Sequence, residues 1–104
     1  MAFADNLKQL PSIAHLAELQ LIDAAGKVVA TIENKPGKAG SLTVYAALAA
    51  KHGGINVAAA QEGIELFAEH TADARANPGK HPNIDRLIEV IESGTVLGVR
   101  TVAL

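Results

Sequence analysis

The sequence has no cysteine and no tryptophan, and its only aromatic residues are Phe3, Tyr45 and Phe67. The absence of cysteine excludes disulfides, thiolate metal sites and a cysteine nucleophile. Three aromatic rings are too few for a surface on which nucleic-acid bases stack. Nine basic residues against eleven acidic ones leave a net charge of −2. This balance argues against a general nucleic-acid binder, because phosphate contacts need an excess of lysine and arginine.

Long apolar runs are also missing. The longest stretch that is poor in charge, Ala39–Ala50, is about half the length that a helix needs to cross a bilayer. The N-terminal segment MAFADNLKQLP carries acid and amide groups where a secretory signal has a basic start and an apolar run. We therefore expect a cytoplasmic protein without a membrane partner. The 104 residues, 49% of them hydrophobic, fit a single compact domain over residues 1–104.

Two segments alternate apolar and polar residues with the period of a β-strand, Ala17–Asp23 and Lys27–Glu33. The residues that join them, DAAG, fit a type I turn in which Gly26 takes the left-handed conformation. These two features together predict a β-hairpin.

Four helices are expected from apolar spacing and end signals. A short one covers residues 3–10, and Ser41 is predicted to cap a second one that ends before Gly53. Asn56 is expected to cap one long helix over Val57–Arg75. Asn83 is expected to cap the last helix, which ends at Ser93-Gly94. On the long helix the spacing predicts an acidic face made of Glu62, Glu65, Glu69 and Asp73.

The final segment, Thr95–Leu104, is rich in β-branched residues and predicts a closing strand interrupted by Gly98. The expected fold is α+β: a hairpin, three main helices and a C-terminal strand that form a small three-stranded, largely antiparallel sheet with helices packed on one face. The last strand is apolar on both faces, with Leu97 and Val99 on one and Val96 and Val102 on the other. An exposed edge of this kind pairs readily with another chain. We therefore expect a homo-oligomer.

Two loops contain Pro-Gly-Lys and lead into predicted helices, Asn34–Ser41 and Asn77–Asn83. A helix N-terminus offers unpaired N–H groups and roughly half a positive charge, and the lysines add to it. The expected function is therefore a non-catalytic binding module for a small anionic ligand or an acidic partner segment. The predicted ligand-binding residues are Lys35, Gly37, Lys38, Ser41, Gly79, Lys80, His81 and Asn83. Plain turns without a ligand are the alternative, because Pro-Gly is the usual pair of a type II turn.

A second cluster supports an alternative function. His70, Asp73, His81 and Asp85, with Glu69, lie within seventeen residues and suit a small enzyme, such as an isomerase, a lyase or a metal-assisted hydrolase. No HExxH spacing is present, and Asp85 in a first helical turn is already favourable for the helix dipole. We therefore assign no catalytic or metal-binding residue from the sequence, and the sequence does not identify a cofactor.

The stretches NKPGK at 34–38 and ELFAEHTADARANPGKHPNIDRL at 65–87 resemble a small bacterial family known only as a domain of unknown function. The resemblance covers essentially the whole chain. It implies a compact bacterial protein of the cytosol, and it implies no catalytic residue, substrate or cofactor.

Overall fold

The computed structural model describes residues 2–104. The predicted hairpin is confirmed: β1 (Leu16–Ile22) and β2 (Val28–Glu33) pair in antiparallel register. Gly26 has a φ of 85°, and its N–H donates to the Asp23 carbonyl at 3.0 Å. The Asp23 carboxylate also accepts the N–H of Lys27 at 2.9 Å. The turn therefore depends on one residue that tolerates positive φ and on one carboxylate that binds the turn's backbone.

The third strand, β3 (Gly98–Ala103), completes a sheet of order β2-β1-β3 in which both neighbours of β1 are antiparallel to it. The α+β class and the small antiparallel sheet are thus confirmed. The strand is shorter than the predicted segment Thr95–Leu104. The reason is that Leu97 pairs with Ile55 in an isolated bridge outside the sheet.

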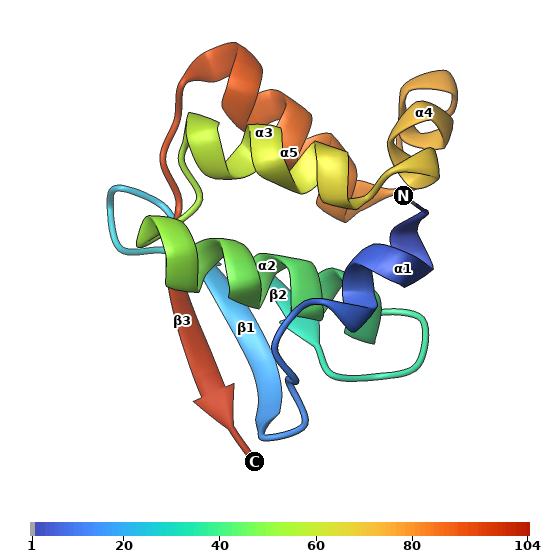
Figure 1. The fold of residues 1–104 in the computed structure, drawn as a ribbon. Helices are drawn as coiled ribbons and strands as arrows, with labels where there is room; N and C mark the ends of the chain where they lie inside the picture. The colour runs from blue at the N-terminus through green and yellow to red at the C-terminus, as the bar shows by residue number, and fades with distance from the viewer. Residues whose placement is uncertain (1) are drawn as a thin grey trace.

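The helices form two layers on one face of the sheet (Figure 1). Helix α2 (Ala39–His52) contacts β1 and β2. Helices α3 (Val57–Leu66) and α5 (Pro82–Ser93) pack on each other, and α3 packs on α2. Two short helices, α1 (Phe3–Lys8) and α4 (Glu69–Ala76), lie together at one end of the molecule.

The core is one contiguous cluster that joins the sheet to both helical layers. Its largest fully buried side chains include Leu19, Leu21, Ile32, Leu42, Tyr45, Leu48, Ile55, Ile84 and Leu87. Burial of each large apolar side chain stabilises the fold by roughly 1.5–3 kcal/mol relative to exposure. The predicted apolar spacing on α5 is confirmed by the burial of Ile84 and Leu87.

The prediction of one long helix over Val57–Arg75 is wrong, because the chain breaks at Ala68. In a continuous helix the Ile64 carbonyl would accept the Ala68 N–H, but Ala68 has a φ of 51° and bonds Glu65 instead, at 3.1 Å. The Ile64 carbonyl accepts a hydrogen bond from the Thr71 hydroxyl at 2.6 Å instead. The expected acidic face is therefore divided between α3, which carries Glu62 and Glu65, and α4, which carries Glu69 and Asp73.

Two of the predicted N-caps are also wrong. The N-cap positions of α2 and α5 are Lys38 and His81, and neither side chain caps its helix. Ser41 and Asn83 lie inside the first turns instead, because α5 begins at Pro82, a residue suited to the first helical position. The Asn56 prediction is confirmed, since its side chain accepts the Ala59 N–H at 2.8 Å.

The face of the sheet opposite α2 carries no helix (Figure 1). The Arg100 guanidinium crosses it and donates to the Gln20 side chain at 2.9 Å. Val29 and Val102 are also exposed there, and β3 forms one edge of the sheet. Within residues 2–104 no helix combines the length and the hydrophobicity that a bilayer crossing requires.

Candidate functional site

The two Pro-Gly-Lys loops border one pocket of about 670 Å³ at the end of the molecule where α1 and α4 lie (Figure 1). The β2–α2 loop and the start of α2 form one side, and the α4–α5 loop and the start of α5 form another. The lining residues are Phe3, Leu7, Thr31, Ile32, Gly37, Lys38, Gly40, Ser41, Phe67, His70, Lys80, His81, Pro82, Asn83, Ile84 and Arg86. Segments that are distant in sequence thus meet at one concave surface.

Most of the predicted ligand-binding residues lie at this pocket. Those that line it are Gly37, Lys38, Ser41, Lys80, His81 and Asn83. Lys35 and Gly79 belong to the same loops but do not line the pocket. The structure therefore brings the two loops together, while ligand binding by these residues stays a prediction.

The β2–α2 loop is held by its own backbone and by one acid. The N–H groups of Lys38 and Ala39 both donate to the Lys35 carbonyl at 2.9 Å, and Gly37 has a φ of 85°. The Lys35 ammonium lies 3.0 Å from the Glu33 carboxylate, and the ammonium of Lys38 lies 3.8 Å from it. The hydrogen bond from Lys35 holds the pKa of Glu33 below its usual value. Lys35 is thus engaged away from the pocket, and the more weakly paired Lys38 lines it.

The α4–α5 loop is closed by Asp85. The Gly79 N–H donates to the Asp85 carboxylate at 2.9 Å, and Gly79 has a φ of 92°. Lys80 N–H donates to the Asn77 carbonyl at 3.1 Å. Asp85 thus stabilises the loop and the first turn of α5, and Gly79 shapes the turn, while its predicted contribution to binding stays a prediction.

Both helix starts at the pocket have backbone N–H groups without an acceptor. Within residues 2–104, the N–H groups of Gly40, Ser41 and Asn83 have no hydrogen-bond acceptor. All three residues line the pocket. Ser41 and Asn83 thus have unpaired backbone N–H groups at the helix starts in place of the capping role that was expected.

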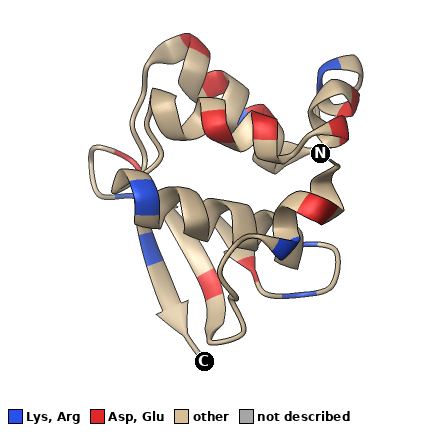
Figure 2. Ribbon diagram, in the orientation of Figure 1, with Lys and Arg blue, Asp and Glu red and all other residues tan. Residues whose placement is uncertain are grey.

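The charged side chains that line the pocket have one sign. Its lining includes Lys38, Lys80 and Arg86, and among the described lining residues none is acidic. Figure 2 shows basic residues on the β2–α2 loop and acidic ones along α3 and α5. Glu33 and Asp73 offset part of this charge, because Glu33 pairs with Lys38 and Asp73 pairs with Lys80. The charged side chains that line the pocket are therefore basic even though the whole chain has a net negative charge.

Arg86 is a pocket residue that the sequence analysis missed. Its guanidinium donates to the Asn83 side-chain oxygen at 2.8 Å and to the Tyr45 hydroxyl at 3.2 Å. The Tyr45 hydroxyl in turn donates to the Asn83 carbonyl. Burial raises the pKa of Tyr45 to about 12, although Arg86 acts in the opposite direction. The spacing of three between Asn83 and Arg86 places both on one face of α5, which is the signal that could have revealed it.

The predicted histidine and aspartate cluster is assembled in part. His81 Nε2 lies 2.6 Å from Asp73 Oδ2, and the rings of His70 and His81 are 5.7 Å apart. Asp85 is engaged with the α4–α5 loop as described above, and Glu69 accepts the Phe3 N–H at 2.8 Å, which holds α1 against α4. In the part of the chain that the structure describes, no group of three or more acid and histidine side chains is arranged to hold a metal ion.

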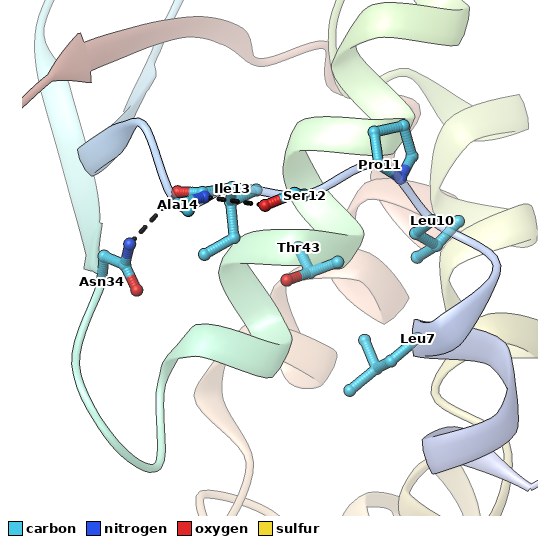
Figure 3. Close-up of a pocket in the computed structure, with 8 residues that line it drawn as sticks. All are labelled: Leu7, Leu10, Pro11, Ser12, Ile13, Ala14, Asn34 and Thr43. Atoms are coloured by element: carbon cyan, nitrogen blue, oxygen red, sulfur yellow. Dashed lines mark hydrogen bonds between the residues drawn. The ribbon is translucent and has the colours of Figure 1, made fainter.

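A second, shallower hollow of about 460 Å³ lies between the α1–β1 segment and α2 (Figure 3). Its one amide side chain, Asn34, donates to the carbonyls of Ile13 (3.2 Å) and Leu16 (2.8 Å). No charged residue lines it among those described. Asn34 therefore fastens this segment to the hairpin, and the cationic pocket is the stronger candidate site.

Fold and pocket together define a small α+β protein with two helix starts and three cationic side chains around one cavity. The chain belongs to the family described as an uncharacterized protein conserved in bacteria (DUF2322), whose model matches residues 3–101. The resemblance noted in the sequence is thereby confirmed. No curated protein matches the chain, and no solved structure does so either.

Proposed function

We propose that this bacterial protein is a cytoplasmic, non-catalytic binding module that holds a small anion, or an acidic partner segment, between the two Pro-Gly-Lys loops. The observation that supports it is the one-sided charge of the pocket, in which Lys38, Lys80 and Arg86 reach one cavity from three segments. We also propose that two copies of the chain pair along the free edge of β3.

The existing ion pairs leave the lysines available to a ligand. The Lys38 side chain is 58% exposed and lies 3.8 Å from Glu33, and that of Lys80 is 59% exposed and lies 3.0 Å from Asp73. Exposed pairs of this kind contribute about 1 kcal/mol or less. A hydrogen bond from an ammonium or a helix N–H to an anionic ligand contributes roughly 1.5–3 kcal/mol. A bound anion thus replaces the weaker contacts at a net gain.

Thermal unfolding with added anions tests this function. The panel contains inorganic phosphate, carboxylates, nucleotides and an acidic peptide, and a ligand at about 100 times its Kd adds about 2.7 kcal/mol of stability. Lys38→Ala and Lys80→Ala should each weaken binding about tenfold, which corresponds to 1.4 kcal/mol. Lys27→Ala, in the hairpin turn, is the matched control and should bind like the wild type. Equal binding by all three variants, or no anion effect at all, contradicts the proposed site.

One observation favours a second candidate, a small enzyme that moves a proton on the bound anion. Asp73 orients His81 at the pocket wall through the 2.6 Å contact, and His81 Nδ1 has no protein partner among residues 2–104. A histidine held in this way is suited to general acid–base work. The test is NMR detection of solvent deuterium entering a carbon-bound position of a ligand found in the panel. Exchange that is lost in His81→Gln, with ligand binding retained, favours the enzyme, and no exchange favours the binding module.

A further inference from the structure

The cationic pocket also has an apolar wall, formed by side chains of α1 and of the α3–α4 junction. The Phe3 and Phe67 rings stack with their centres 5.3 Å apart and an angle of 15° between them. The His70 ring stands edge-on to Phe3 at 4.9 Å. Phe3 and Leu7 are only half-buried, so they offer apolar surface to the pocket.

This wall lies directly beside the free N–H groups at the start of α2. A side chain at Gly40 would come within 3.1 Å of the Phe3 ring and 3.5 Å of the Leu7 side chain. The absence of that side chain lets the ring lie over the first turn of α2. A ligand whose anionic group binds the N–H groups of Gly40 and Ser41 therefore has its remaining atoms next to Phe3.

The volume points in the same direction. At about 670 Å³ the cavity falls within the range of 300–1,000 Å³ that is usual for sites of small organic molecules. A phosphate or sulfate ion alone leaves most of that space to water, and the apolar wall then gains no partner.

We infer that the ligand is an amphipathic anion, with one carboxylate or phosphate group bound by the cationic loops and an apolar body, an alkyl chain or an aromatic ring, packed on Phe3 and Leu7. This inference rests on the proposed anion-binding function. Each methylene buried on the wall contributes about 0.8 kcal/mol, which is an affinity gain of about fourfold. The affinity should therefore rise steeply with the length of the apolar body while the charge stays constant.

Calorimetric titration of the whole chain with two sets of probes tests the inference. In the series from acetate to hexanoate the affinity should rise at least tenfold, and phenyl phosphate should bind at least tenfold more tightly than inorganic phosphate. The set that binds more tightly identifies the anionic group. Hexylamine and hexanol measure any binding that does not need the negative charge, and both should bind more than tenfold more weakly than hexanoate.

Leu7→Ala should remove most of the gain with chain length and leave the affinity for acetate and inorganic phosphate unchanged. Phe3→Leu is a second variant of the apolar wall. It keeps an apolar residue on α1, so it tests the wall even if Leu7→Ala loosens that helix. Ile88→Ala, which truncates a half-buried residue of α5 away from the pocket lining, is the matched control and should keep the full gain.

The outcomes separate the two proposals. Equal affinity along both series, with phosphate or acetate still bound, overturns the amphipathic ligand and leaves the anion site intact. Binding of hexanol or hexylamine as tight as that of hexanoate overturns the anion site, and so does a lack of binding by every probe.

Discussion

Asp73 Oδ2 lies 2.6 Å from His81 Nε2 and 3.0 Å from the Lys80 ammonium, so one carboxylate of α4 holds two consecutive residues of the pocket rim. The hydrogen bond from His81, followed by that from Lys80, lowers the pKa of Asp73 to about 2. The carboxylate therefore stays charged at neutral and mildly acidic pH.

Replacement of Asp73 by asparagine should make stability less dependent on pH under acidic conditions. The pKa of an aspartate in the unfolded chain is about 3.9, so the native state favours the charged form. Its contribution is fully present above about pH 4 and is lost as the pH falls through about 2. Urea unfolding of wild type and Asp73→Asn should show a stability difference that is constant at neutral pH and shrinks between pH 4 and 2. A difference that is independent of pH contradicts an ionic role.

The single tyrosine of the chain reports on the second network of the pocket. Because burial raises the pKa of Tyr45 to about 12, its stabilising effect is present below pH 10 and is lost as the pH rises from about 10 to 12. Phenolate absorbance should therefore appear near pH 12, or together with alkaline unfolding, and Tyr45→Phe should show no such signal. A titration midpoint near pH 10 in folded protein contradicts the burial of the hydroxyl.

Gly63 lies where α3 meets its two helical neighbours, and its replacement by alanine should be destabilising. An added Cβ would lie 2.7 Å from the Leu87 side chain and 2.9 Å from that of Leu48, both fully buried. Overpacking of this kind costs about 1–3 kcal/mol. The higher helix preference of alanine offsets about 1 kcal/mol of that cost, so the net loss of stability should be up to about 2 kcal/mol. Thermal unfolding of Gly63→Ala, with Gln61→Ala on the exposed side of α3 as control, measures the effect. A higher Tm in Gly63→Ala contradicts the close helix contact.

At the break between α3 and α4, a substitution by glycine should be stabilising. Ala68 has a φ of 51°, and a strained backbone of this kind costs about 1–3 kcal/mol for a residue with a Cβ. Ala68→Gly should therefore raise the free energy of unfolding by about 1 kcal/mol after the entropic cost of glycine is subtracted. Ala58→Gly, at an exposed position inside α3, should lower it by a similar amount. If both variants are destabilised equally, Ala68 is an ordinary helical residue.

The proposed pairing of two copies makes a prediction about solution mass. The edge of β3 and its exposed Val102 suit antiparallel addition of a second β3. Light scattering should give the mass of a dimer for the wild type and of a monomer for Val102→Lys, because a charged lysine on an edge strand opposes edge-to-edge pairing. Val29→Lys, on β2, should stay dimeric. A monomeric wild type at high concentration rejects the pairing.

Local patterns explain why the hairpin was predictable and the helix break was not. Strand alternation and the DAAG turn are properties of neighbouring residues. The bounds of the observed strands differ from the predicted bounds by no more than one residue. The break depends on Ala68, which carries no glycine or proline signal, and on a hydroxyl bond from Thr71 back to Ile64. The apolar spacing gives no sign of the break, because Phe67 would be buried in a continuous helix and is also buried in the observed structure.

The candidate site was predictable in its parts and not in its assembly. The two Pro-Gly-Lys loops were visible in the sequence, but their meeting depends on how α2 and α5 pack. Arg86 escaped notice because one arginine on an amphipathic helix usually faces solvent. Its role depends on Tyr45, a residue far away in sequence whose hydroxyl accepts a hydrogen bond from the Arg86 guanidinium.

The order of strands has a kinetic consequence. Central strand β1 pairs with β2 across a tight turn but with β3 across the whole helical region, and the Gln20–Arg100 contact joins residues 80 positions apart. A contact that closes so long a loop forms only after much chain entropy has been lost, and such contacts slow folding. The hairpin and the helices should therefore form early, and the docking of β3 should limit the rate. Until it docks, one long edge of β1 is open to pairing with other chains, so the refolding yield should fall as protein concentration rises.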